Sequence, residues 1–220
     1  MNNKSVVQKM IEWGEHNTDE FPWRNPESPY EIIIAEIMLI RTAAEQVEPV
    51  YLNFLDRYPD IYTLHQSEET EILDMIEELG LKWRAERLKQ FANYVVTEKD
   101  GTFPDVQDEL EKIPGIGSYV AASTLTFHFR KRAIMIDSNT VRFFKRYNGI
   151  IFDGEGRRSS DLESRMDELV PEKDRRATEF NESFLDFMRK VCRASPEKPA
   201  CSTCMLNDGC IYYSKDNRDN

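Results

Sequence analysis

The stretch LEKIPGIGSY at residues 110–119 decides the fold of this chain. Gly115 and Gly117 flank one apolar residue, Ile116, and this pattern predicts a tight turn between two helices, with Ile116 packed into the core. The amides at the start of the second helix lack partners within the helix, so they can point at a phosphate oxygen. A plain corner between two helices is the alternative. The turn is therefore a candidate phosphate site, formed by Ile113, Pro114, Gly115, Ile116, Gly117 and Ser118.

Basic residues follow this turn in a chain that is acidic as a whole. The 220 residues include 40 Asp and Glu against 29 Lys and Arg, a formal net charge of −11. Residues 1–113 carry a net −13 and residues 151–220 a net −3, whereas residues 114–150 carry a net +5. The acidic total argues against a nucleic-acid partner, because such proteins usually replace phosphate counterions with Lys and Arg. The basic segment argues for a nucleic-acid partner. The alternative is that these charges only form a solvent-exposed helix face.

The composition is that of an ordinary globular protein, with 40% hydrophobic and 31% charged residues, which excludes disorder as the dominant state. The most apolar run, residues 32–40, is interrupted by Glu36 and is too short to span a membrane. The first residues lack the basic start and apolar middle of a secretory signal. We therefore expect a monomer without membrane contact that stays in the cytoplasm, associated with the nucleoid if the source is a prokaryote.

Helix-start signals recur along the chain. Ser28 is followed by Pro29 and Glu31, a capping pattern that predicts a helix over residues 29–40. Thr42, with Glu45 three residues later, predicts the start of the next helix. The one β-like run, residues 132–136, is too short and too isolated to form a sheet. The sequence predicts an all-α protein of about ten helices.

All four cysteines lie in the last 29 residues, in the pattern C-x8-C-x2-C-x5-C. A disulfide framework would be spread more widely and needs an oxidising compartment. Four thiolates in a short loop can hold an iron–sulfur cluster or a tetrahedral zinc ion, although zinc sites more often show two C-x2-C pairs. Thiols without a metal are the third alternative. The candidate metal ligands are Cys192, Cys201, Cys204 and Cys210.

Together, the glycine turn, the cysteine pattern and an aspartate about twenty residues after the turn resemble the helix–hairpin–helix DNA glycosylases of the endonuclease III type. That aspartate is Asp137, within IMIDSNTVR at residues 134–142. The cysteines resemble the loop in which this family holds a [4Fe–4S] cluster, with a first interval longer by two residues. Strings such as PWR at 22–24 and LGL at 79–81 look most like the branch shared by adenine glycosylases and by thymine glycosylases acting on T·G mismatches.

The resemblance covers nearly the whole chain and implies a two-domain fold. We expect a six-helix barrel domain with the helix–hairpin–helix over residues 22–132. The second domain would be helical, formed by residues 1–21 and 133–220, and would carry the C-terminal iron–sulfur loop.

Three side chains take chemical roles by this resemblance. Asp137 would stabilise the positively charged sugar, and as the N-cap of a helix over residues 138–147 it also stays ionised. Glu36 would contact the departing base, with an exposed, solubilising glutamate as the alternative. Tyr119 stands where the lyase members carry a lysine, and a phenol cannot form an imine, so the lyase route through that position is closed. Ile40 and Arg41 are candidates for the wedge that fills the gap left by an extruded base.

These roles together imply a monofunctional DNA glycosylase of base excision repair. It would extrude thymine or uracil mispaired with guanine from double-stranded DNA and hydrolyse the N-glycosidic bond, leaving an abasic site. An adenine glycosylase acting opposite guanine or 8-oxoguanine is the alternative. A DNA-binding module without catalysis is a third reading, which predicts loss of the acidic groups, yet Asp137 and Glu36 are both present.

Overall fold

The computed structural model describes residues 3–152, 154–194 and 197–216, and within these residues it contains only helices and connecting segments, with no strand. The all-α prediction is therefore confirmed. The α-helices are α1 (Asn3–Gly14), α2 (Pro29–Leu39), α3 (Ala44–Arg57), α4 (Ile61–Gln66), α5 (Glu69–Ile76), α6 (Trp83–Lys99), α7 (Gln107–Leu110), α8 (Ser118–Phe127), α9 (Ser138–Tyr147), α10 (Ser160–Leu169), α11 (Asp174–Lys190) and α12 (Ile211–Asp216). Short 3₁₀ helices are η1 (Pro22–Arg24), η2 (Glu77–Leu79), η3 (Cys201–Thr203) and η4 (Asn207–Gly209).

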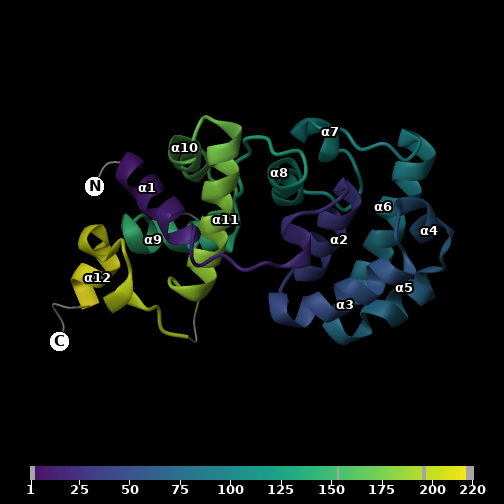
Figure 1. Cartoon of the computed structure of the whole chain (residues 1–220), viewed down its shortest axis with the longest axis horizontal. Helices are drawn as coiled ribbons and strands as arrows, with labels where there is room; N and C mark the ends of the chain where they lie inside the picture. Colours follow the sequence, from purple (N-terminus) through teal and green to yellow (C-terminus); the bar gives the residue numbers. More distant parts are fainter. Residues whose placement is uncertain (1–2, 153, 195–196, 217–220) are drawn as a thin grey trace. The chain divides into compact units, whose positions relative to one another are not determined.

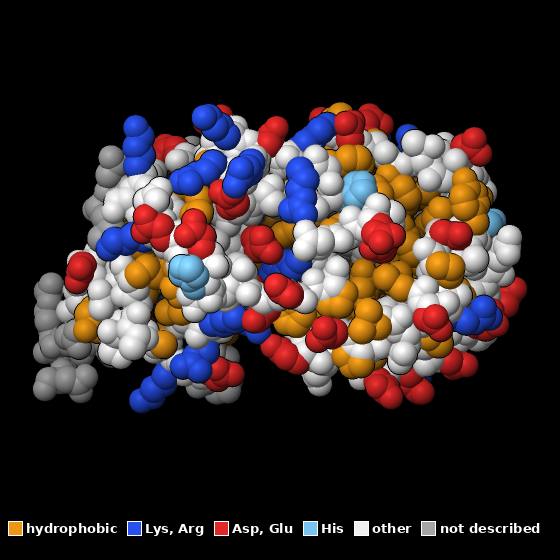
Figure 2. Space-filling view, viewed as in Figure 1, with side chains coloured by type: hydrophobic (Ala, Val, Ile, Leu, Met, Phe, Trp, Pro, Cys, Tyr) orange, Lys and Arg blue, Asp and Glu red, His pale blue; other side chains and the backbone are white. Residues whose placement is uncertain are grey.

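The chain forms two compact units (Figure 1). Unit 1 joins the two ends of the sequence, Met1–Asp19 and Arg130–Asn220, and unit 2 is the continuous segment Glu20–Phe129. Helices α1 and α9–α12 belong to unit 1, and α2–α8 belong to unit 2. Figure 2 shows hydrophobic and acidic side chains over the face of unit 2, and many of the visible Lys and Arg side chains on unit 1. No helix in the described part of the chain combines the length and the apolar character that a membrane span requires.

Unit 2 is built around α2, which contacts α3, α6 and α8. The helix starts where the sequence predicts, because the Ser28 hydroxyl accepts a hydrogen bond from the Glu31 amide and Pro29 occupies the first turn. Its residues from Ile32 to Met38 are all buried. Because these consecutive buried residues cover every side of α2, the helix lies inside the unit rather than on its surface.

Unit 1 packs α1 against α11, with α9 in contact with α10, α11 and α12. At Gly14, an added Cβ would meet the Ser183 hydroxyl oxygen at 1.8 Å, so a glycine is required for the close approach of the two helices. Phe143, Phe180 and Phe184 lie in its hydrophobic core. This core supports the segment that carries Asp137 and the cysteine loop.

The predicted helix start at Thr42 is wrong by one residue. Helix α3 is capped by Ala43, whose side chain offers no hydrogen bond. The Thr42 hydroxyl instead accepts a hydrogen bond of 2.7 Å from the Arg84 guanidinium, a tertiary contact that local sequence does not reveal. Residues 132–136 lie in unit 1 and form neither helix nor strand, as expected of a run too short for a sheet.

Candidate active site and nucleic-acid interface

The glycine turn of unit 2 has the predicted helix–turn–helix geometry. Ile113 and Ile116 are 1% and 4% exposed and anchor the turn in the core, and the Ile116 amide donates to the Ile113 carbonyl at 3.0 Å. Gly115 has a φ of +88°, which explains the glycine there. Gly117 is the exposed N-cap of α8 and has no side chain with which to cap the first amides. The start of α8 therefore has no side-chain cap, as expected of a helix start that binds an anion.

Gly115 and Gly117 differ in backbone conformation and in the space available for a side chain. We therefore expect alanine to have different effects at the two positions. At Gly117 the φ is −95° and an added Cβ would meet no described atom within 4 Å, so Gly117→Ala should leave thermal stability unchanged. We expect it to weaken DNA binding about tenfold, the cost of one lost hydrogen bond to a charged group, because a methyl group keeps the phosphate away from the amides.

Gly115→Ala is the matched variant, in which we expect the thermal stability rather than the phosphate contact to change. Its added Cβ would meet the Arg87 Cγ atom at 2.6 Å, and its φ would place an L-residue in the left-handed region. We expect a loss of about 1–2 kcal/mol of stability, seen as a lower melting temperature.

Unchanged DNA affinity of Gly117→Ala in a binding titration at fixed salt would contradict the phosphate-binding role of this turn.

Glu36 is buried, with 6% of its surface exposed, so the alternative of a solubilising surface glutamate is wrong. It lies on α2 and accepts a hydrogen bond from the Ser123 hydroxyl of α8. Tyr119 precedes Ser123 by one helical turn on α8 and is half-buried. The packed pair α2 and α8 thus places the carboxylate and the phenol on neighbouring helices of unit 2. Sequence reasoning missed Ser123, although its position four residues after Tyr119 marks the same helix face.

The wedge candidates follow the C-terminal end of α2. Ile40 is half-buried, whereas Arg41 is exposed and has a φ of +59°. A non-glycine residue in this region is uncommon, and such residues often occur at functional sites. The loop is therefore held in an unusual conformation at the point where the resemblance places the wedge.

Asp137 belongs to unit 1 and is the N-cap of α9, as predicted. Its Oδ1 accepts hydrogen bonds from the Asn139 amide at 2.8 Å and the Thr140 amide at 3.0 Å. The Thr140 hydroxyl also accepts a hydrogen bond from the Asp137 amide, which completes a capping box. The helix start thus fixes the orientation of a carboxylate that is half-buried.

A chain of hydrogen bonds runs from Asp137 to the first cysteine. The Asn139 side-chain amide donates to Asp137 Oδ2 at 2.5 Å, and the Arg142 guanidinium donates to Asn139 Oδ1 at 2.7 Å. Arg142 also donates to the Cys192 carbonyl at 2.9 Å. Sequence reasoning counted Arg142 only as part of the basic segment, whereas its contacts are internal to unit 1.

The four cysteines form no disulfide and are all half-buried. Arg146 donates to the Cys192 sulfur at 3.4 Å, and the Cys210 thiol donates to the Arg146 carbonyl at 3.5 Å. Burial, together with the neighbouring thiols, raises the pKa of Cys204 to about 11. The thiols therefore share one neighbourhood. Among the described residues, however, no group of three or more Cys, His, Asp or Glu side chains is arranged to hold a metal ion.

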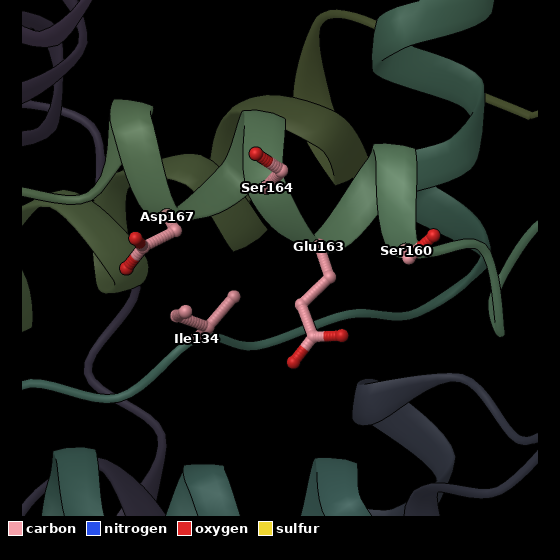
Figure 3. Close-up of a pocket in the computed structure, with 5 residues that line it drawn as sticks. All are labelled: Ile134, Ser160, Glu163, Ser164 and Asp167. Carbon is pink, nitrogen blue, oxygen red and sulfur yellow. The ribbon is translucent and has the colours of Figure 1, made fainter.

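One hollow, of about 400 Å³, lies in unit 1 between α10 and the segment before Asp137. Figure 3 shows its lining, in which Glu163 and Asp167 project from α10 and Ile134 comes from the segment that precedes Asp137. Asp167 forms an ion pair with Arg132 at 2.7 Å. An acidic hollow repels phosphate, and it contains none of the residues predicted for catalysis or DNA binding, so we assign it no part in the site.

Comparison with known proteins identifies the family. Residues 34–171 match the HhH-GPD superfamily of base excision DNA repair proteins. The chain belongs to this superfamily. Thymine-DNA glycosylase of Aeropyrum pernix is 34% identical over 97% of this chain and 96% of its own length. Thymine/uracil-DNA glycosylase of Methanothermobacter thermautotrophicus is 35% identical over 90% of each protein. Adenine DNA glycosylases match at lower identity.

The fold agrees with that assignment. The solved structure of a thermostable thymine-DNA glycosylase superposes with a TM-score of 0.86 at 32% identity, covering 97% of both chains. The HhH-GPD match includes the glycine turn, Glu36 and Asp137, and it ends before the first cysteine. The superfamily match therefore does not reach the cysteine loop.

Proposed function

We propose that this HhH-GPD protein is a monofunctional DNA glycosylase that releases thymine or uracil mispaired with guanine and leaves an abasic site. The observation that carries the proposal is the oriented carboxylate of Asp137 in a chain whose position 119 is a tyrosine. The thymine and thymine/uracil glycosylases among its relatives support the choice of base.

Base release begins when the mispaired nucleotide leaves the stack, since its glycosidic carbon cannot be reached inside the duplex. A mismatched base is extruded at a lower cost than a paired one, which favours T·G and U·G over T·A. The amides at the start of α8 hold the phosphate backbone. Ile40 or Arg41 fills the gap in the stack.

Asp137 acts on the sugar. As the N-glycosidic bond breaks, positive charge develops on the sugar ring, and a carboxylate already fixed by its cap hydrogen bonds stabilises that charge without reorganising. Water then attacks the anomeric carbon C1′, and the proton that it loses goes to the departed base. The products are the free base and an abasic site in an intact strand.

Glu36 and Tyr119 act on the base. The buried Glu36 carboxyl, held by Ser123, hydrogen-bonds the edge of the extruded base, and Tyr119 lines the same pocket. Because both side chains come from packed helices of unit 2, their positions are set before the base arrives.

We also propose that Cys192, Cys201, Cys204 and Cys210 hold a [4Fe–4S] cluster. Four thiols from one short loop, three of them packed against the core of unit 1, match the donor set of such a cluster. When bound, the cluster supplies structural cross-linking of the loop. Arg142 and Arg146 already join this loop to α9 through the Cys192 carbonyl.

Tyr119→Lys should convert the enzyme to strand cleavage. An amine at this position can attack the sugar and form an imine, which eliminates the 3′ phosphate, whereas the phenol cannot. We expect nicked T·G duplex without alkali and a covalent complex trapped by borohydride. Tyr119→Phe is the matched control and should give neither product. The absence of a trapped complex in an active, folded Tyr119→Lys protein would contradict the placement of this residue at the position of the lyase lysine.

Base release from a panel of labelled duplexes tests the proposed function. The panel holds T·G, U·G, T·A, A·G and A·8-oxoguanine pairs, each treated with and without hot alkali. We expect cleavage of the T·G and U·G strands only after alkali. Release of adenine would assign the protein to the adenine branch, and binding without any release would make it a non-catalytic module.

A further inference from the structure

Arg84 is the largest fully buried side chain among the described residues, with 0% of its surface exposed. Its guanidinium donates to the Leu79 carbonyl at 3.0 Å and to the Gly80 carbonyl at 3.5 Å through Nη1. Through Nη2 it donates to the Ile40 carbonyl and, at 2.7 Å, to the Thr42 hydroxyl. Among the described residues it forms no ion pair, and burial alone lowers its pKa.

A buried cation without an acidic partner is costly, so its presence calls for a reason. An apolar side chain would fill the same volume without desolvating a charge. What an apolar side chain lacks is the planar fork of donors that reaches several acceptors at once. Arg84 uses this fork on two separate loops. One of them contains Ile40 and Thr42, which are 44 and 42 residues away from Arg84 in the sequence.

The two loops share an unusual backbone feature. Arg41 in the first loop has a φ of +59°, and Leu81 in the second has a φ of +54°. Both are non-glycine residues in the left-handed region, a conformation that persists only when the surroundings hold it. Each lies directly after a residue whose carbonyl accepts from Arg84, namely Ile40 and Gly80.

Helix α6 connects these loops to the glycine turn. Trp83, 37% exposed, lies beside Arg84 and stacks with the Arg87 guanidinium at 4.4 Å. The Arg87 Cγ atom in turn packs against Gly115, where an added Cβ would meet it at 2.6 Å. The two loops and the phosphate-binding turn therefore belong to one continuous part of unit 2.

We propose that Arg84 is a positioning residue that holds loop 40–42 and loop 79–81 in one arrangement and thereby presents Ile40 and Arg41 to the duplex. The proposal rests on the function proposed above, because that function gives the wedge its task. Arg84 touches neither the base nor the sugar in this role. It acts through the backbone of the loops.

The test compares Arg84→Met, Arg84→Lys and Thr42→Val with a matched control, Lys89→Met. Lys89 lies on the same helix and donates to two carbonyls, those of His65 and Ser67, both at 2.6 Å, in a loop with no predicted DNA contact. Its loss removes a comparable set of hydrogen bonds elsewhere in unit 2. Thr42→Val removes one acceptor of Arg84 and keeps the rest of the fold.

Two readouts separate positioning from general stability. Amide hydrogen exchange of the free protein reports whether residues 40–43 and 79–82 are held. Fluorescence of 2-aminopurine placed beside a T·G mismatch reports extrusion of the base, and single-turnover thymine release gives the rate. We expect Arg84→Met to speed exchange in both loops and to reduce extrusion and release at least tenfold. Thr42→Val should give a smaller effect of the same kind.

The conservative variant sharpens the test. Arg84→Lys keeps the charge but cannot reach both loops, so it should behave like Arg84→Met. Lys89→Met should exchange faster only around residues 65–67 and release base within twofold of wild type. Unchanged exchange in both loops of folded Arg84→Met and Thr42→Val proteins would overturn the proposal, as would full rescue by Lys. A wild-type protein that releases no base would instead refute the proposed function. Amide hydrogen exchange in the Arg84 variants would still show whether Arg84 holds the two loops.

Discussion

Asp137→Asn is expected to lose roughly 10³-fold in the rate of thymine release, the size of effect that follows loss of a preorganised electrostatic group. The amide is nearly the same shape as the carboxylate but carries no charge to stabilise the developing sugar cation. Its oxygen can still accept from the amides of Asn139 and Thr140, so the α9 cap survives. We therefore expect a folded protein that binds T·G duplex normally and does not release the base. Single-turnover release under enzyme excess measures the rate.

The chain supplies a matched control for this variant. Asp60 caps α4 in the same way, since its side chain accepts from the Thr63 amide at 2.8 Å within a capping box. Asp60→Asn therefore makes the same chemical change in the same local motif, far from any predicted contact with the sugar. It should keep full activity. Equal loss in both variants would show that the Asp137 effect is one of helix capping, and full activity of Asp137→Asn would reject the carboxylate mechanism.

The second large effect concerns the cysteine loop. Protein purified without oxygen is expected to be coloured and to contain iron and acid-labile sulfide in equal amounts, as a [4Fe–4S] cluster requires. Cys204→Ser should lose both, because a hydroxyl is a poor ligand for the soft iron–sulfur core. We also expect slower base release, since the Cys192 carbonyl is joined to Asp137 through Arg142 and Asn139.

Ser202→Ala is the control, because Ser202 is exposed and lies between two of the cysteines. It should retain the iron content and the activity of the wild type. Stoichiometric zinc in a colourless protein would contradict the iron–sulfur proposal while keeping a metal at the site. Full activity and stability without any metal would leave the cysteines as ordinary thiols.

Local signals in the sequence predicted much of this fold. The Ser28 and Asp137 caps depend on residues one turn apart, so they can be identified without knowing the tertiary structure. The glycine turn is also local, because its shape depends on one left-handed glycine and two buried isoleucines.

Contacts between distant residues could not be predicted in this way. Thr42 has the sequence features of a cap, yet its hydroxyl is occupied by Arg84, 42 residues away. The Ser123 partner of Glu36 is 87 residues distant, and no periodicity indicates that pairing. The same holds for Arg142, whose basic side chain looked like part of a DNA-binding surface and is used to join α9 to the cysteine loop.

Direct chromatography of the base released from a single T·G duplex is the measurement that decides the function. We predict free thymine in an amount equal to the abasic sites that alkali reveals, with an intact strand before alkali. The same duplex with T·A in place of T·G should release far less. Thymine release accompanied by an equal amount of nicked strand before alkali, or no thymine from any mismatch, would contradict a monofunctional mismatch glycosylase.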